Sequence, residues 1–302
     1  MGRAALTVWS LFLLGTSLCW GQLNGTSGDI QLATERAVVL GKSGQFGQGL
    51  ELLQPYLDNP TPASAKAFYV AGFLLKERYK SSGFGPDRSE AVSRLVTSLD
   101  LDAQSGRKAP WGESAGQALT YLGGTYFDDA VLAVRTFEPG DETEIFDLFE
   151  AHVAVAQHLN PGLDATAERT EFHKNVARAY HQWYGTTGKE GHFEGVVFHY
   201  SQAVSLSPKD ITATYNLAVS VYNRGVALLK SMGVETSLGE MFAIQERSAE
   251  FFEQALPWFE RANELQPNRP ETLRGLMVVH HSLNDNAAAE TFRMQLEKAL
   301  KP

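Results

Sequence analysis

The chain has 302 residues, 43% of them hydrophobic, which is enough for one long array or two ordinary folded domains. The formal net charge of −9 argues against nucleic acid as the main partner, because phosphate binding needs clustered lysine and arginine. No run of 18 apolar residues follows residue 25, so we expect no transmembrane span in the mature protein.

Residues 1–21 have the pattern of a cleavable signal peptide. Arg3 provides a positive start, residues 4–18 are uncharged and mostly apolar, and Gly21 is a small residue at the expected cleavage site. The apolar core is too short to cross a membrane comfortably. We therefore expect export, to the periplasm or out of the cell, and a flexible tail over residues 22–28.

A lipid anchor on Cys19 is the alternative use of this segment. A lipoprotein signal wants Gly or Ala directly before the cysteine and a leucine three residues before it, whereas Leu18 and Thr16 occupy these places. Cleavage is therefore preferred to lipidation. Because Cys19 is the only cysteine, the cleaved protein would have neither disulfides nor a thiol nucleophile.

From residue 29 onward, apolar residues at helical spacing predict a series of helical hairpins. The pattern is weak at first: "LGKSGQFGQGLELL" near 40–53 suggests a turn and a second helix, and "YVAGFLL" at 69–75 suggests a first helix. "YLGGTYF" at 121–127 suggests the first helix of a third hairpin. The expected units span residues 29–60, 63–103, 114–161, 168–208, 210–267 and 268–301.

A repeated ending marks three of these units. The sequences "AQHLNP", "AVSLSP" and "ANELQP" share the form Ala-x-x-Leu-x-Pro, and each follows small and large residues at helical spacing. Proline cannot extend a helix, so each ending predicts a helix stop. The expected contact residues and closing prolines are Ala156, Pro161, Ala177, Ala203, Pro208, Ala218, Ala255, Phe259, Ala262 and Pro267.

The endings lie 47 and 59 residues apart, which leaves extra residues in two units. In the first of these, "GTTGKEG" at 185–191 is predicted to lengthen the turn between the helices. In the second, the extra residues between Tyr222 and Ala255 keep a helical apolar pattern. They predict a hairpin whose two helices are both longer than usual.

These residues resemble the tetratricopeptide repeat family. The family's first helix has a large residue, then Gly or Ala, then Tyr. Its second helix ends in the Ala-to-Pro spacing described above. The match is best from about residue 170 to 300. The resemblance implies an all-α, right-handed solenoid of antiparallel helix hairpins, some of them elongated. The long hairpin and the export signal are similar to exported tetratricopeptide proteins of Bacteroidota-type bacteria.

The resemblance also implies that the first helices line an inner face that binds a protein or peptide. Basic, aromatic and amide side chains there are able to hold a peptide backbone or carboxylate. Asn175 and Asn216 resemble the inner asparagines with which some family members hold a C-terminal carboxylate, and an ordinary solvated face is the alternative interpretation. The candidate binding residues are Lys174, Asn175, Arg178, His181, Tyr215, Asn216, Tyr222 and Arg274.

One motif suggests catalysis. "GESAG" at 112–116 fits the Gly-x-Ser-x-Gly pattern that would make Ser114 an esterase nucleophile, but that chemistry needs a preceding strand, and the sequence has no strand pattern there. The eight histidines include no pair at His-x-x-x-His or Glu-x-x-His spacing. We therefore expect no catalytic residue, no cofactor and no metal site.

Together these patterns predict an exported, non-catalytic scaffold that binds a protein or peptide and not nucleic acid. A structural subunit of a cell-envelope assembly, held through the long hairpin, is the alternative. An esterase acting through Ser114 is a weaker alternative.

Overall fold

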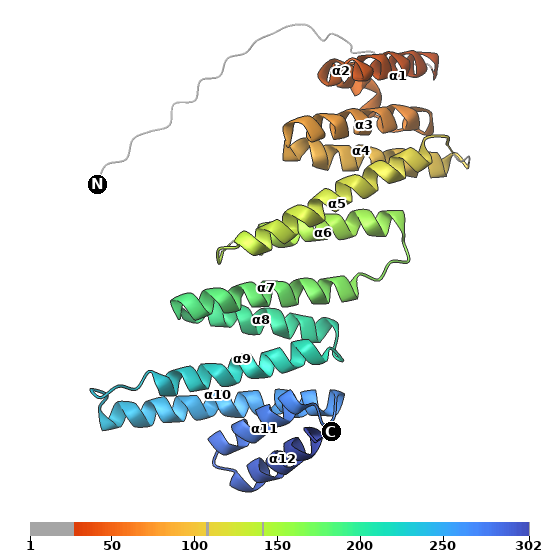
Figure 1. Cartoon of the computed structure of the whole chain (residues 1–302). Helices are drawn as coiled ribbons and strands as arrows, with labels where there is room; N and C mark the ends of the chain where they lie inside the picture. The colour runs from red at the N-terminus through yellow and green to blue at the C-terminus, as the bar shows by residue number, and fades with distance from the viewer. Residues whose placement is uncertain (1–26, 107–108, 141, 302) are drawn as a thin grey trace, which may run out of the picture. The chain divides into compact units, whose positions relative to one another are not determined.

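The computed structural model describes residues 27–106, 109–140 and 142–301. Within these ranges the protein is all-α, with twelve α-helices, one short 3-10 helix and no strand (Figure 1). The predicted fold class, a solenoid of helix hairpins, is confirmed. The chain divides into two compact units, residues 1–119 and 120–302, which we call unit 1 and unit 2 and describe separately.

Each of the first three α-helices of unit 1 packs on the next one along the chain. The helices are α1 (Ser27–Lys42), α2 (Phe46–Leu57), the 3-10 helix Pro62–Ser64, α3 (Ala65–Ser82), α4 (Gly85–Gln104) and the first part of α5 (Gly112–Thr136). The first helices of successive pairs also meet, since α1 contacts α3 as well as α2. Contacts restricted to near neighbours in sequence are the defining property of a solenoid.

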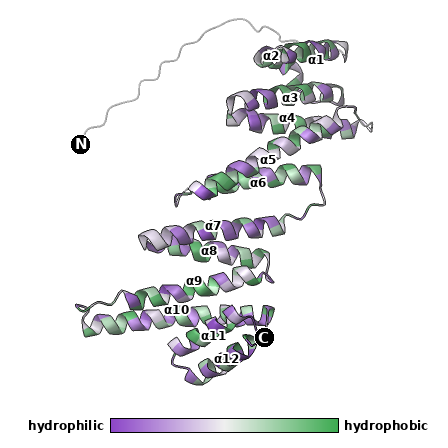
Figure 2. Cartoon of the chain, viewed as in Figure 1, coloured by the Kyte–Doolittle hydropathy of each residue, from purple (hydrophilic) through white to green (hydrophobic). Residues whose placement is uncertain are grey.

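Unit 2 repeats this arrangement with longer elements. Its helices are the rest of α5, α6 (Glu142–Leu159), α7 (Thr166–Thr187), α8 (Glu190–Leu206), α9 (Ile211–Lys230), α10 (Leu238–Leu265), α11 (Pro270–Ser282) and α12 (Asn286–Ala299). From α7 to α12, each helix packs on its successor, and α9 also contacts α11. Figure 2 shows hydrophobic and hydrophilic residues on every helix, as expected for helices that bury one face.

Large residues packed against small ones hold neighbouring helices close together, both within a pair and between successive pairs. A Cβ at Gly275 would run into the ring of Phe259, and a Cβ at Gly195 would run into the ring of Tyr180. Ala203 at the end of α8 has no exposed surface. The other small residues of the repeat pattern are equally buried, namely Ala177, Ala218, Ala255 and Ala262, and Phe259 is 1% exposed.

The α5–α6 pair departs from the expected contact residue. Ala156 is only half-buried, whereas Val153 and Val155 on the same helix are buried. A Cβ at Gly123 of α5 would lie 3.1 Å from Val155. The close approach in this pair therefore uses Gly123 and Val155, one residue away from the position that the repeated ending indicated.

The three closing prolines lie just beyond the ends of their helices. Pro161, Pro208 and Pro267 are exposed, and each follows a helix end by two residues. Because proline lacks the N–H that a helix needs, it accounts for these ends. Pro257, by contrast, lies inside α10, which continues on both sides of it.

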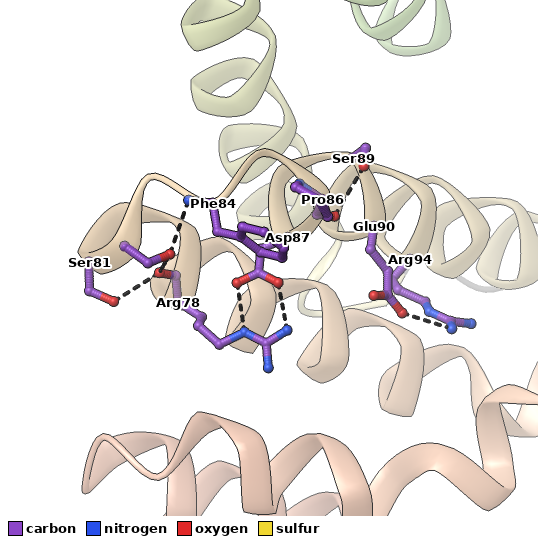
Figure 3. A network of polar contacts seen from close by, with 9 residues as sticks. Arg78, Ser81, Phe84, Pro86, Asp87, Ser89, Glu90 and Arg94 are labelled. Atoms are coloured by element: carbon purple, nitrogen blue, oxygen red, sulfur yellow. Dashed lines mark hydrogen bonds and ion pairs between the residues drawn. The ribbon is translucent and has the colours of Figure 1, made fainter.

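The α3–α4 hairpin of unit 1 is fixed by an ion pair across its turn. Arg78 Nε and Nη2 donate to the two carboxylate oxygens of Asp87 at 2.7 and 2.6 Å (Figure 3). Asp87 is buried, and hydrogen bonding to it raises the pKa of Arg78. Gly83 has a φ of +69°, which ends α3 sharply and lets α4 turn back toward it.

The elongated hairpin is formed by α9 and α10. These helices have 20 and 28 residues, against 13 and 14 in α11 and α12. Ser237 and Glu240 form a capping box that starts α10. The extra residues between Tyr222 and Ala255 therefore lengthen both helices, as predicted.

Two expectations differ from the structure. The segment 185–191 was expected to lengthen a turn, but α7 continues to Thr187 and α8 begins at Glu190, so the extra residues lengthen the helices instead. Gly188, with a φ of +64°, makes the reversal in two residues. In addition, α1 begins at Ser27, so the last two residues of the expected tail are helical.

The expected signal peptide and Cys19 lie outside the described residues, as does the tail up to residue 26. Among the helices of the described ranges, none is long and apolar enough to cross a membrane.

Candidate functional site

A groove in unit 2 lies between α5 and α7, the first helices of two successive pairs, with one residue from α6 at its base. Its volume is about 600 Å³. We call it the α5–α7 groove. It is lined by Phe127, Val131, Val134, Arg135, Phe149, Ala167, Glu168, Glu171, Phe172, Asn175, Arg178, Ala179 and Gln182.

The base of this groove is aromatic and aliphatic. The rings of Phe149 and Phe172 stack at 4.1 Å with an interplanar angle of 10°. Phe127 is 41% exposed and touches only the ring of His152 among the aromatic residues of the described chain, at 5.1 Å. An exposed phenylalanine beside a stacked pair provides an apolar surface on which a partner side chain can pack.

Charged and amide side chains surround the apolar base. The rim carries two arginines and two glutamates, so it offers both signs of charge. Arg178 Nη1 donates to Asn175 Oδ1 at 2.6 Å, which orients the two side chains together. Such a rim is able to bind backbone amides and charged side chains of an extended segment.

Asn175 and Arg178 are the two predicted binding residues that the structure brings into this groove. Both are exposed on α7. His181 on α7 and Arg274 on α11 are also exposed, but neither lines the groove.

Lys174 is used for packing and not for an open surface, contrary to its expected position. It is 4% exposed, and its Nζ donates to Asp210 Oδ2 at 2.8 Å and to Glu171. Burial disfavours the charged ammonium, but the bonds to Asp210 and Glu171 outweigh this effect and raise its pKa. Asp210 also caps α9 by accepting from the N–H of Ala213 at 2.7 Å. Lys174 thus ties α7 to the start of α9.

The predicted residues on α9 also take part in internal contacts. The hydroxyls of Tyr222 and Ser282 lie 3.2 Å apart, and the Tyr222 ring lies 5.1 Å from that of Phe252. Arg269 stacks over Tyr215 at 4.4 Å. Asn216 is half-buried near the phenol of Tyr200, and burial raises the pKa of that phenol.

Sequence reasoning missed the apolar base of the groove. Phe127 belongs to the stretch "YLGGTYF", but the repeat pattern there uses only Leu122, Gly123 and Tyr126. One signal in the sequence could have indicated this surface. Phe127 is an aromatic residue of the first helix, at a position that the repeat contacts do not use.

A second, smaller groove lies between the first helices of unit 1, α1 and α3. Its volume is about 250 Å³. We call it the α1–α3 groove. It is lined by Val38, Gly41, Lys42, Phe46, Tyr69, Val70, Phe73, Leu74 and Glu77.

The esterase motif "GESAG" lies at the start of a helix in the described chain. Ser114 lies exposed in the first turn of α5, without the strand that an esterase nucleophile requires. No group of three or more His, Cys, Asp or Glu side chains in the described ranges is placed to hold a metal ion.

Comparisons with known proteins do not assign the chain to a family. No family model matches the sequence, and no curated protein matches it. Among solved structures, an IFIT1 monomeric mutant with Gppp-AAAA has a TM-score of 0.35 and 13% identity, covering 92% of this chain and 70% of its own.

Two other solved structures are similar over most of their length. YrrB, a TPR protein with an unusual peptide-binding site, has a TM-score of 0.25 and 17% identity, covering 83% of this chain and 94% of its own. Acl4, an assembly chaperone of RpL4, has a TM-score of 0.22 and 12% identity, covering 87% and 99%. Similarity at these scores carries no function.

Proposed function

We propose that the protein is a non-catalytic helical-repeat scaffold that binds a protein or peptide segment in the α5–α7 groove. The observation that carries this proposal is the exposed ring of Phe127 in a groove that also has an aromatic base and a polar rim. Helical-repeat proteins bind partners on extended surfaces formed by successive repeats. The segment would place an apolar side chain against Phe127 and its backbone beside Asn175 and Arg178.

The size and chemistry of the groove favour a peptide over a compact charged ligand. A volume of about 600 Å³ falls within the range of ligand-binding clefts. The rim has two arginines and two glutamates, so the charges of its lining balance. The groove therefore has no strong positive charge that would select a polyanion. The partner segment would therefore be apolar at its centre and of mixed charge at its ends.

Two exposed apolar residues of α5 allow a matched test. Phe127 lines the groove, whereas Leu132, which is 58% exposed, does not. A peptide selected from a random library on the purified protein would be titrated against Phe127→Lys and Leu132→Lys. We expect Phe127→Lys to weaken binding at least tenfold, because a hydrated ammonium replaces the apolar contact, and Leu132→Lys to stay within twofold.

Equal peptide affinities of the two variants and the parent would reject the groove. If both variants bind the selected peptide as the parent does, the α5–α7 groove is not the binding surface. Circular dichroism of both variants provides the control for folding.

We also propose that the protein is exported through cleavage after Gly21. The support is the sequence pattern of residues 1–21. Sequencing of the mature N-terminus should begin at Gln22, and a start at Met1 or at a lipidated Cys19 would contradict export by this route.

One observation favours the alternative function of an assembly subunit. Large apolar side chains are exposed where α9 and α10 join: Val234 is fully exposed, Leu238 is 67% exposed and Phe242 is 61% exposed. Such a patch is typical of an interaction surface. The double variant Leu238→Glu, Phe242→Glu would be compared with the parent by velocity sedimentation of the native complex. If the variant no longer forms a large complex, the hairpin is an assembly contact. An unchanged complex would argue against the hairpin as an assembly contact.

A further inference from the structure

A second pocket in unit 2 lies on the other side of α7, where α6, α7 and α8 meet. Its volume is about 600 Å³, and it shares no residue with the α5–α7 groove. We call it the histidine pocket. It is lined by Glu142, Thr143, Phe146, His173, Tyr180, Gly191, Glu194, Gly195, Phe198 and His199.

Aromatic rings form its inner wall. The buried ring of His199 lies between Phe146, at 5.6 Å and an angle of 7°, and Tyr180, at 5.5 Å and 28°. His173 contacts the same group, with its ring 4.8 Å from Phe146. Phe198 adds an outer ring that is 55% exposed. Five rings from three helices therefore meet beside an open space.

The two histidines of the wall are neutral at neutral pH. Their Nδ1 atoms lie 3.1 Å apart, a contact in which one nitrogen donates a hydrogen and the other accepts it. Burial lowers the pKa of His199 to about 4 and also lowers the pKa of His173. The imidazoles thus contribute polarisable rings and no positive charge.

The charged groups that line the pocket are both carboxylates. Glu142 stands at the start of α6, where its Oε2 accepts from the N–H of Gly140 at 3.1 Å. Glu194 is exposed on α8. No lysine or arginine is among the lining residues. The pocket therefore combines aromatic rings with negative charge that no neighbouring cation in its lining offsets.

We propose that the histidine pocket binds a small organic ammonium ion. Its alkyl part would lie against the rings of Phe146 and Phe198, and its cationic nitrogen would lie toward Glu142 and Glu194. Aromatic rings bind the alkyl part by removing its apolar surface from water, and the carboxylates attract the cationic nitrogen by direct charge interaction. The volume fits a ligand of this class. This inference does not depend on the proposed peptide groove.

Two glycines permit a test that does not disturb the fold. Gly191 lines the pocket, and a Cβ added there meets no atom within 4 Å, so a larger side chain would project into open space. Gly185 on α7 is equally open but does not line the pocket. Gly191→Leu should therefore fill the pocket, and Gly185→Leu is its matched control.

The probes are hexylammonium and the neutral hexanol, titrated by NMR into the full chain at pH 7.5. We expect saturable binding of hexylammonium, at least tenfold tighter than any binding of hexanol. Gly191→Leu should weaken it at least tenfold, and Gly185→Leu should leave it within twofold. Glu194→Gln should weaken it at least threefold, whereas Glu260→Gln, an exposed carboxylate on α10, should have no effect.

Several results would overturn the proposal. Equal binding of hexanol and hexylammonium would show an apolar pocket without selection for charge. Unchanged binding to Gly191→Leu would place the amine elsewhere. Binding of a lysine-containing peptide without any binding of free hexylammonium would show that the site takes a protein side chain instead of a small ligand.

Discussion

The α1–α3 groove of unit 1 and the α5–α7 groove of unit 2 occupy equivalent places between successive first helices, yet they offer different surfaces. The first is about 250 Å³ and has one lysine and one glutamate in an apolar lining. The second is about 600 Å³ and has four charged residues and two amides around an aromatic base. The repeat fixes where a groove forms, and the residues outside the repeat contacts decide what it can bind.

The two units also differ in what stabilises them. In unit 1, the pair Arg78–Asp87 closes a single hairpin. In unit 2, Lys174 joins α7 to Asp210 in front of α9, and thereby links two hairpins. Local perturbations should therefore stay local in unit 1 and extend to neighbouring hairpins in unit 2.

The largest expected effect comes from overpacking unit 2. Ala203 has no exposed surface, so Ala203→Leu should lower the free energy of unfolding by about 1–3 kcal/mol. Lys209→Ala, at an exposed position beside it, should change stability by less than about 0.5 kcal/mol. The measurement is urea unfolding followed by circular dichroism.

Hydrogen exchange would locate the damage in the same variant. Amides of α7 to α10 should exchange faster, because a solenoid transmits strain to adjacent repeats. Amides of α3 should keep their rates. Equal urea midpoints for Ala203→Leu and Lys209→Ala would mean that Ala203 is not at a tight helix contact.

The next effect compares the two ion pairs. Lys174→Met leaves the carboxylate of Asp210 without its ammonium and should cost about 1–2 kcal/mol, since a hydrogen bond to a charged group is lost. Arg78→Met should cost at least as much, because it leaves the carboxylate of Asp87, whose side chain is only 5% exposed, without its guanidinium. Urea unfolding of both variants measures the losses, and an unchanged midpoint for Lys174→Met would contradict the linking role of Lys174.

A smaller effect follows from pH, and it should be confined to unit 2. All eight histidines lie in this unit. The pKa of His199 falls to about 4 in the folded protein, so the unfolded chain binds more protons below its ordinary value of 6.5, and stability falls as pH decreases from 6.5 toward 4. Between pH 7.5 and 5.5 the loss should be about 1 kcal/mol.

The measurement is the urea midpoint of the parent and of His199→Asn at both pH values. The variant should lose less stability on acidification, whatever its stability at pH 7.5. Protection factors in unit 1, which are exchange rates corrected for the intrinsic effect of pH, should not change over this range. An equal pH response in parent and variant would show that His199 does not titrate on unfolding.

Much of the fold could be predicted because small and large residues at helical spacing are a local pattern. Phe259 and Gly275 illustrate this: each stands in a recognisable helix, and the structure packs one against the other. The extra residues at 185–191 were misplaced because their glycines suggest a turn, whereas tertiary packing keeps most of the segment helical.

The candidate site could be predicted only in part. Asn175 and Arg178 were found because they occupy exposed positions of a well-defined helix. The burial of Lys174 could not be seen, since its partner Asp210 comes from the turn before a later helix. Phe127 was missed because it belongs to a hairpin whose repeat pattern is weak, and its exposure depends on how α5 and α7 lie beside each other.

The most direct test of the α5–α7 groove is photo-crosslinking from within it. Benzoylphenylalanine would replace Phe127, Leu132 or Phe73 in three separate variants, and each would be irradiated with the selected peptide bound. Phe127 lines the α5–α7 groove, Phe73 lines the α1–α3 groove, and Leu132 lines neither. The account predicts a strong adduct at position 127 and none at position 132. An adduct at 132 equal to that at 127, or an adduct at 73 alone, would contradict it.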